Sequence, residues 1–411
     1  MPWSELRRPN AQCRAVNRAN RRRTGGFEIE GKPVALPERA NAWGKVQSSR
    51  VAGVYISYPF CAQKCTYCNF ASGVFPRERE RAYVAALLAE IAAHRWEWRP
   101  ETVYLGGGTP SNLAADDLRA VLDAVPGRPW IEATIEAAPG GITAEQARDW
   151  AACGINRVSL GVQSFVEKEI RRTGRKHTAE TVAREIGVLH ANGIGSVNID
   201  LIAGLSGQTE ASWRESLDWI ERLAPEHVSV YMLEVDEDSR LGAEMLARGA
   251  RYGAAETPDD DQVAAFYEIA VERLAALGII RYEISNFARP GCESRHNLKY
   301  WKLEPYVGFG ADAHSFDGRM RGRNAETVEQ YLDGGWQAGD LPHLAHADER
   351  FFVGLRLMEG IRPDEREWRR HDAAIRRFLN AGLLEAADGM LCLSSRGVLV
   401  SNEVFAEFLT S

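Results

Sequence analysis

From about residue 53 to residue 237 the sequence alternates strand-like and helix-like segments. Six short runs rich in β-branched and apolar residues are separated by Gly, Pro and Asn breaks and by longer helical stretches. Parallel strands need crossover connections, usually helices, so this order predicts a parallel sheet covered by helices. Six units predict an α/β fold built on a partial (β/α)6 TIM-like barrel rather than the closed eight-fold form. The predicted strands are 53–58, 102–105, 130–137, 157–163, 196–203 and 227–233.

Two of the intervening segments carry apolar residues at helical spacing. Repeats at i, i+3, i+4 and i+7 place side chains on one face of a helix, and such a face packs against a sheet. We therefore assign both stripes to the core and not to a cofactor site. The two stripes are Val84, Leu87, Leu88 and Ile91, and Trp213, Leu217, Ile220 and Leu223.

A short loop directly after the first predicted strand contains three cysteines. Cys61, Cys65 and Cys68 have the spacing C-x3-C-x2-C. Thiolates favour iron–sulfur clusters, zinc or copper(I). A structural zinc site uses four ligands, and no second Cys or His pair follows at zinc-finger distance. A cubane cluster normally takes four cysteines, so three cysteines predict a 4Fe-4S cluster with one iron open to an external ligand.

Polar or glycine features fall at the ends of all six predicted strands. In barrels of this kind the loops at the carboxyl ends of the strands surround the functional mouth. The cysteine loop ends the first strand and GGGTP, at 106–110, ends the second. Glycines there let the backbone approach a ligand closely. Glu136 ends the third strand, Gln163 ends the fourth, Asp200 lies late in the fifth and Glu234 closes the sixth.

An adenosine cofactor needs acceptors for its ribose hydroxyls, a charge or donor for its carboxylate and an apolar wall for its base. Glu136, Gln163, Arg175 and Asp200 supply the polar groups. Because they belong to one rim, we predict that they form a ligand shell.

Composition restricts the classes of partner molecule and the cellular compartment that we expect. The net charge of −7 argues against a broad nucleic-acid-binding surface, which is normally basic. No apolar run approaches the roughly 18 residues of a membrane span, and no secretory signal is present. The seven cysteines do not form a disulfide framework. We therefore expect a soluble, cytoplasmic protein without a nucleic-acid partner.

The chain divides into four predicted regions. Residues 1–46 are Arg-rich without a periodic apolar face, which predicts a disordered basic arm. The barrel occupies 47–237, and 238–313 forms its extension and connecting segment. Residues 314–411 form a small C-terminal α+β domain with a winged-helix-like order: the end of a helix at 378–384, a hairpin turn at Asp388 and Gly389, and a closing helical or mixed segment at 397–409. DNA binding does not follow from that order.

The cysteine loop followed by GGGTP resembles the signature of the radical SAM superfamily. In that superfamily the open iron is chelated by S-adenosylmethionine (SAM). Over most of residues 53–411 the segments are similar to the oxygen-independent coproporphyrinogen III oxidase family. That resemblance implies one or two SAM molecules. The residues at matching positions are Tyr55, Gly107, Gly108, Thr109, Glu136, Gln163, Arg175, Asp200 and Glu234, although the oxidases carry a small residue at the last position.

Two departures separate the sequence from the oxidases. They carry a further cysteine where this chain has Phe70, and a histidine where it has Ser57. CNF, with HNLKYW at 296–301 and VGFGADAHSF at 307–316, resembles the heme chaperone branch of the family instead. That resemblance implies heme or porphyrin as cargo, a heme-acceptor protein as partner, and peripheral membrane contact through that acceptor.

Heme needs an apolar slot and usually an axial ligand such as His, Cys, Met or Tyr. His296, close in sequence to Cys292, Tyr300 and Trp301, is the first predicted constellation, and His314 is the second. The structural alternative is that His296 satisfies backbone groups of a buried loop. Two enzymatic alternatives also stay open: decarboxylation of coproporphyrinogen III, and a radical SAM methyltransferase or tailoring reaction.

Overall fold

The computed structural model describes residues 52–409, apart from residues 70, 335, 337–339 and 345–347. The predicted basic arm at 1–46 and Phe70 lie outside the described residues.

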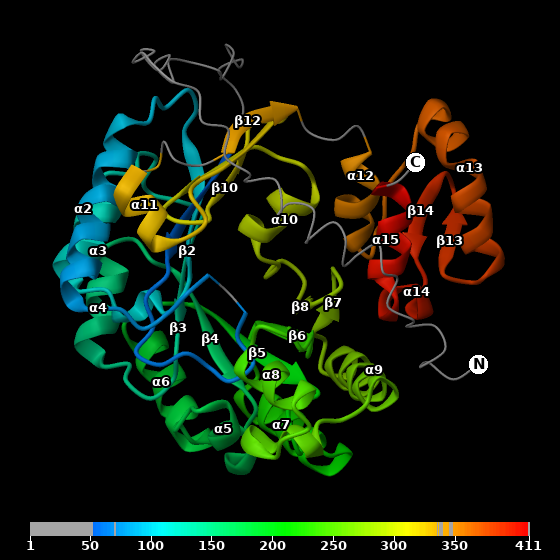
Figure 1. The fold of residues 1–411 in the computed structure, drawn as a ribbon, viewed down its shortest axis with the longest axis horizontal. Coiled ribbons are helices and arrows are strands. Elements are labelled where there is room, and N and C mark those ends of the chain that lie inside the picture. The colour runs from blue at the N-terminus through cyan, green and yellow to red at the C-terminus, as the bar shows by residue number, and fades with distance from the viewer. Residues whose placement is uncertain (1–51, 70, 335, 337–339, 345–347, 410–411) are drawn as a thin grey trace.

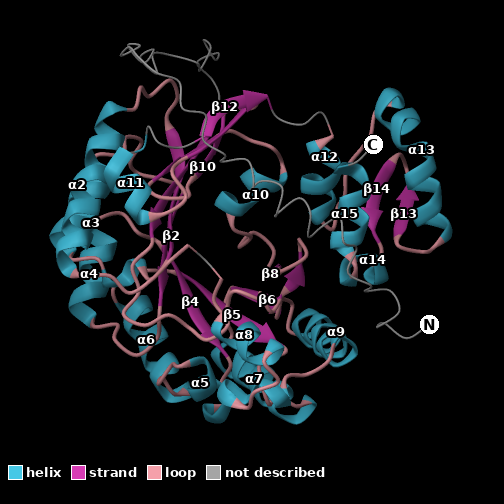
Figure 2. Ribbon diagram, in the orientation of Figure 1, coloured by secondary structure: helices cyan, strands magenta, loops and turns pink. Residues whose placement is uncertain are grey.

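All six predicted strands are present and pair in chain order. They form the parallel centre of one curved sheet (Figures 1 and 2). The second strand is longer than predicted and the third starts two residues later, at Glu132. The strands are β1 Ala52–Tyr58, β2 Pro100–Gly107, β3 Glu132–Ala137, β4 Arg157–Gln163, β5 Ser196–Ala203 and β6 His227–Met232.

The crossover helices cover one face of these strands (Figure 1). Both predicted stripes pack inward: Leu87 and Ile91 are buried on the first, and Trp213 and Leu217 on the second. A capping box at Thr209 starts the second of these helices. The helices are α2 Arg77–Ala93, α3 Ala115–Asp123, α4 Ala144–Ala152, α5 Glu167–Thr173, α6 Ala179–Ala191, α7 Glu210–Leu223, α8 Arg240–Leu246 and α9 Asp260–Ala276.

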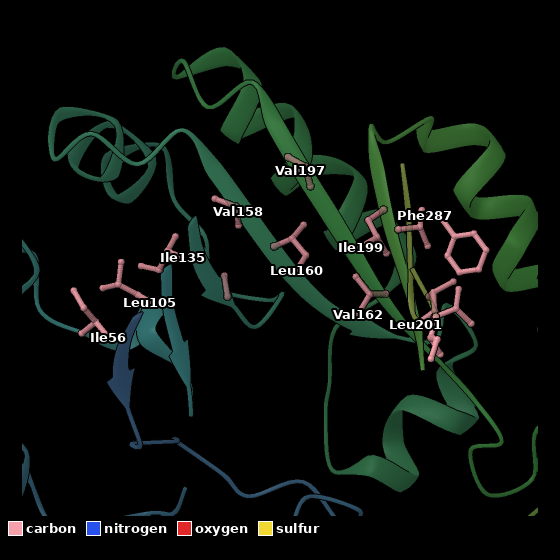
Figure 3. Close-up of a cluster of buried hydrophobic side chains, with 14 of the residues drawn as sticks. Ile56, Leu105, Ile135, Val158, Leu160, Val162, Val197, Ile199, Leu201 and Phe287 are labelled. Atoms are coloured by element: carbon pink, nitrogen blue, oxygen red, sulfur yellow. The ribbon is translucent and has the colours of Figure 1, made fainter. Parts of the chain in front are cut away.

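The two faces of the strands differ in polarity. Apolar side chains such as Ile56, Leu105 and Ile135 are buried in the core between sheet and helices (Figure 3). Because side chains alternate along a strand, their neighbours face the concave side. We call that side the lumen. It is lined by polar and aromatic residues from several strands, among them Tyr55, Tyr104, Glu136, Ser159, Asp200 and Tyr231.

The sheet continues beyond the six strands at both edges. Its twelve strands follow the order β12-β11-β10-β9-β1-β2-β3-β4-β5-β6-β8-β7, and among the described residues no pairing joins the two edges, so the barrel is open. The added elements are β7 Ile280–Arg281, β8 Asn286–Ala288, α10 Arg295–Trp301, β9 Tyr306–Phe309, β10 His314–Phe316, β11 Met320–Arg323, α11 Val328–Gly334 and β12 Asp340–Leu344. The domain boundary expected at residue 314 falls inside this sheet, because β10 to β12 build outward from β9.

The C-terminal unit is a hairpin surrounded by helices. Asp388 and Gly389 form its turn with φ values of 53° and 77°, as their sequence predicts. The predicted helix end lies at Asn380, earlier than 384, because Leu384 already begins the hairpin. The elements are α12 Glu349–Val353, α13 Glu365–Asn380, β13 Leu384–Ala387, β14 Met390–Leu393, α14 Ser395–Leu399 and α15 Ser401–Leu409.

The C-terminal unit is attached to the barrel by backbone and ring contacts. The amide of Ile284 donates to the carbonyl of Arg356 at 3.2 Å, and Met358 N donates to Tyr282 O at 3.0 Å. The Arg356 guanidinium lies 4.4 Å from the Trp301 ring centroid. No helix in the described part of the chain combines the length and apolarity needed to cross a membrane.

Candidate functional site

The cysteine loop is fixed to the carboxyl end of β1 by main-chain hydrogen bonds. Cys61 N donates to Gly73 O at 2.8 Å, and Thr66 N donates to Thr173 O at 3.3 Å, at the end of α5. On its other side Leu241 N, in α8, donates to Thr66 O at 2.8 Å. The loop is therefore positioned by segments from three parts of the barrel.

The thiols of Cys61, Cys65 and Cys68 are half-buried and form no disulfide. Beside them is a hollow of about 490 Å³. Among the residues that the structure describes, no three His, Cys, Asp or Glu side chains are grouped to hold a single metal ion. Three thiols in one loop, none of them in a disulfide, fit the donor set of an iron–sulfur cluster. The hollow is lined by Ala62, Gln63, Lys64, Cys65, Cys68, Val74, Asp238, Ser239 and Arg240.

The glycine run at the end of β2 braces this loop. Gly108 N donates to Tyr58 O at 2.8 Å, and Thr109 N donates to Phe60 O at 2.9 Å. A Cβ on Gly108 would lie 2.6 Å from the oxygen of Phe60, so a side chain there would collide with the backbone. Gly107 has φ of 109°, which favours glycine. GGGTP therefore supports the loop that carries the cysteines, in addition to its predicted place beside a ligand.

Arg175 links the cysteine loop to the end of β4. Its Nε donates to Cys65 Sγ at 3.4 Å, and its Nη1 donates to the carbonyl of Gly161. Gln163 is buried nearby, with φ of 71° at an irregularity of β4. An added Cβ on Gly161 would touch both side chains, so Arg175 and Gln163 border the same backbone.

Glu136 has a raised pKa at the centre of the predicted shell. Its carboxylate accepts from Tyr104 Oη at 2.9 Å and from Gly107 N at 3.1 Å. Desolvation and the nearby charge of Asp200 raise the pKa of Glu136 to about 7, although the two hydrogen bonds oppose the shift. A carboxyl group that is half-ionised near neutral pH can respond to the charge of a ligand.

Asp200 projects from β5 into the same lumen. Its carboxylate accepts from Ser159 Oγ at 3.1 Å and from Asn198 Nδ2 at 2.7 Å. Desolvation raises the pKa of Asp200 despite these donors. The Asp200 charge also raises the pKa of Glu136, so the two carboxyl groups share one electrostatic environment.

Tyr55 completes this part of the wall. Its ring stacks on Tyr104 with centroids 6.2 Å apart. Glu234 lies elsewhere: its side chain is exposed and accepts from Asn402 Nδ2, in α15, at 3.2 Å. Eight of the nine residues predicted to bind SAM therefore border one end of the barrel, and Glu234 contacts the C-terminal unit.

The HNLKYW segment forms α10, at the opposite end of the barrel. The Glu132 carboxylate accepts from Ser294 Oγ, Arg295 N and His296 N at 2.8–3.1 Å, which anchors the start of the helix. Lys299 is buried and pairs with Glu101 and with Glu304. Glu101 and Glu132 lie at the amino ends of β2 and β3, so α10 closes the bottom of the barrel.

The predicted heme ligand His296 has both ring nitrogens hydrogen-bonded in this conformation. Its ring is buried, with Nδ1 2.9 Å from Thr102 Oγ1 and Nε2 2.7 Å from Tyr300 Oη. Burial lowers the pKa of His296 to about 3. The ring also stacks on Tyr104 of the lumen wall, with ring centroids 5.3 Å apart. These contacts suit the structural alternative, and the role of His296 as a heme ligand stays a prediction.

Cys292 also lies at the bottom of the barrel. It follows β8, whose Ala288 pairs with His227 at the start of β6. His314 differs, because its side chain is exposed at the start of β10, close to the mouth. The three residues predicted to bind heme are thus not brought together.

Sequence reasoning missed three residues that line the lumen. Tyr104 bridges Tyr55 and Glu136, and Tyr231 is 43% exposed although it lies within β6. Arg157 is buried at the start of β4, where its Nη1 is 3.5 Å from Thr134 Oγ1 and its Nε has no hydrogen-bond partner among the described residues. Alternation along β2, two residues before Gly106, was the signal that could have found Tyr104.

Comparison with known proteins agrees with this site. Residues 55–220 match the Radical SAM superfamily. Heme chaperone HemW of Bacillus subtilis is 32% identical over 86% of this chain and 98% of its own length, and Heme chaperone HemW of Mycobacterium tuberculosis is 34% identical over 92% and 98%. The chain belongs to the heme chaperone HemW family of radical SAM proteins.

The HemW family assignment agrees with the observed architecture. The structure of coproporphyrinogen III oxidase (HemN) from Escherichia coli superposes with a TM-score of 0.75 at 22% identity, covering 89% of this chain and 92% of that chain. This likeness confirms the radical SAM fold, with its open parallel barrel. As a radical SAM protein, this HemW-family chain uses a 4Fe-4S cluster and SAM.

Proposed function

We propose that this protein is a heme chaperone that binds heme and transfers it to an acceptor protein. The observation that carries the proposal is the similarity to proteins named Heme chaperone HemW over nearly the full length of both chains. The partners are therefore heme and a heme-acceptor protein.

Three cysteines and one arginine form the part of the site that would bind the cluster. Cys61, Cys65 and Cys68 hold the cluster, and Arg175, which donates to Cys65, offsets the negative charge of the thiolates. When bound, a cluster of this kind with SAM would supply one-electron chemistry. The Gly107–Thr109 backbone, Glu136, Gln163 and Asp200 would hold the SAM, and the raised pKa of Glu136 would let this carboxyl group ionise when a cationic ligand arrives.

Heme itself is the cargo in this proposal. The tyrosine-lined lumen offers aromatic faces that can pack on a porphyrin. Coproporphyrinogen III oxidation is the enzymatic alternative, which the shared fold permits but Ser57 and Phe70 disfavour. We place the protein in the cytoplasm, without a nucleic-acid partner because of its net charge of −7. Any membrane contact is peripheral and made through the acceptor.

The test combines two assays on one anaerobically reconstituted preparation. Hemin titration should give a saturable change of the Soret band, and mixing the loaded protein with an apo-hemoprotein should move the heme to that acceptor. Absence of both effects would overturn the chaperone function. Vinyl product formed from coproporphyrinogen III, SAM and a reductant would establish the oxidase instead.

A further inference from the structure

His227, at the start of β6, is a buried histidine that belongs to none of the predicted ligand sets. Its Nδ1 lies 2.7 Å from Asn198 Oδ1, and its Nε2 lies 2.9 Å from Tyr282 Oη. A neutral imidazole has one donor and one acceptor nitrogen, whereas a charged one has two donors. The protonation of this ring therefore determines how its two neighbours are oriented.

The surroundings keep the ring of His227 neutral. Burial lowers the pKa of His227 well below its usual value, and the positive charge of Arg157 adds to that shift. The two hydrogen-bond partners of the ring, an amide and a phenol, are uncharged, and burial raises the pKa of Tyr282. The ring therefore carries one N–H donor and one acceptor nitrogen.

Asn198 determines which ring nitrogen carries the proton. Its Nδ2 lies 2.7 Å from Asp200 Oδ1 and 2.7 Å from Ser159 Oγ. The hydroxyl of Ser159 donates its proton to Asp200 Oδ2, so it accepts from Asn198, and an ionised Asp200 only accepts. The amide oxygen of Asn198 must then face His227, where it accepts from Nδ1–H.

The other ring nitrogen connects His227 to α10. Because Nε2 has no proton, it accepts from the hydroxyl of Tyr282. Tyr282 Oη accepts in turn from Ser294 N at 3.2 Å, and Ser294 is the residue that caps the start of α10. Four hydrogen bonds therefore run in one direction, from the start of α10 to the carboxylate of Asp200.

This series of hydrogen bonds joins the helix of the HNLKYW segment to the predicted SAM shell. Hydrogen bonds that run in one direction polarise and strengthen one another. Without the donor on His227, the amide of Asn198 would lose the contact that keeps its nitrogen toward Asp200. The orientation of Asp200, the predicted acceptor for the SAM ribose, therefore depends on a ring that does not touch SAM.

We infer that His227 is a positioning residue that links the SAM site to α10, holding Asp200 through Asn198 on one side and Ser294 through Tyr282 on the other. This inference rests on the proposed function in placing SAM beside Asp200. SAM binding and the start of α10 are then coupled, and by linkage each affects the other to the same extent.

The first test is a double-mutant cycle on the SAM affinity of the anaerobically reconstituted full-length protein, measured by equilibrium dialysis. His227→Ala and Asp200→Ala should each weaken SAM binding about tenfold. The double variant should bind like Asp200→Ala alone, because His227 acts through Asp200. Unchanged affinity in His227→Ala, or additive losses of about a hundredfold in the double variant, would overturn the inference.

The second test separates the two sides of the ring. In His227→Asn the amide nitrogen keeps a donor near the position of Nδ1, but the side chain is too short to reach Tyr282. This variant should bind SAM within about threefold of wild type. In the wild-type protein SAM should slow hydrogen exchange in peptides from α10 about twofold, and His227→Asn and Tyr282→Phe should lose that response. The same response in these variants as in wild type would contradict the link to α10.

The tautomer can be observed directly. Nitrogen-15 spectra of histidine-labelled protein, with the His227 signals identified by their loss in His227→Asn, should show a neutral ring protonated on Nδ1 from about pH 5 to 8. A charged ring, or a proton on Nε2, would overturn the assigned direction of the hydrogen bonds.

His371→Ala is the matched control, because it removes another buried histidine, one that contacts Asp348 in the C-terminal unit. It should lower stability but leave SAM affinity unchanged. An equal loss of SAM binding in His371→Ala would show that His227→Ala acts through stability alone. Failure of the wild-type protein to bind hemin would overturn the chaperone function and leave the role of His227 intact.

Discussion

Replacing Glu136 by glutamine should change how stability depends on pH. The folded state raises the pKa of this carboxyl group from 4.5 to about 7. The folded protein therefore binds the proton more tightly than the unfolded chain does. The resulting stabilisation is complete below about pH 4.5 and is lost as the pH rises through about 7.

The size of this effect follows from the shift. At 1.36 kcal/mol per pKa unit, the shift corresponds to about 3 kcal/mol, an upper value because Glu136 is only half-buried. Glu136→Gln cannot ionise, so it should gain stability relative to wild type as the pH rises from 5 to 8. The glutamine loses one acceptor for Tyr104 or Gly107, a cost of about 1 kcal/mol that is present at every pH.

Urea denaturation of cluster-free protein between pH 5 and 8 measures this difference. Charged groups away from Glu136 contribute equally to the pH dependence of both proteins. The difference between the two free energies of unfolding therefore reports the Glu136 carboxyl group alone. Glu145→Gln, an exposed glutamate in the first turn of α4, is the control and should give a constant offset. Parallel stability profiles for Glu136→Gln and wild type would refute the argument from desolvation.

Three further substitutions test the site and the α10 end of the barrel. Cys65→Ala should abolish iron binding and the cluster absorbance at about 400 nm, while the far-UV circular dichroism spectrum stays unchanged. An iron content equal to that of the wild-type protein would refute the cluster assignment. Gly108→Ala should cost roughly 1–3 kcal/mol of unfolding free energy and lower iron occupancy, because its Cβ would meet Phe60 O; a wild-type melting temperature with full iron content would contradict the bracing role. His296→Ala should cost roughly 2–4 kcal/mol, since Thr102 and Tyr300 lose a buried partner, and a stability loss below about 0.5 kcal/mol would show that α10 does not depend on this ring.

The sequence predicted the barrel well because the two-residue period of a strand and the 3.6-residue period of a helix can both be recognised within a short segment. Six strand-like runs became the six parallel strands, and the stripe around Leu87 packs as its spacing requires. The strands β9 to β12 were missed because they are short and because β9, from which the others build outward, pairs with β1 from more than 200 residues away. Nothing local in VGFG indicates that Gly308 will lie beside Tyr55.

Local patterns also predicted some residues of the site and not the long-range contacts of others. Residues at strand ends, such as Glu136 and Asp200, were found because topology alone places them at one rim. The burial of His296 was not predicted, because it depends on Thr102 and Glu132 in distant strands. The motifs identified a family, whereas the contacts of this histidine became visible only in the folded chain.

The placement of α10 restricts the route by which a bound molecule can enter or leave the barrel. Buried Lys299 and its carboxylate partners hold α10 across the amino ends of β2 and β3. A molecule bound on the lumen side of the sheet would therefore leave at the carboxyl ends of the strands or past the unpaired edges of the open barrel, and not through the end that α10 covers.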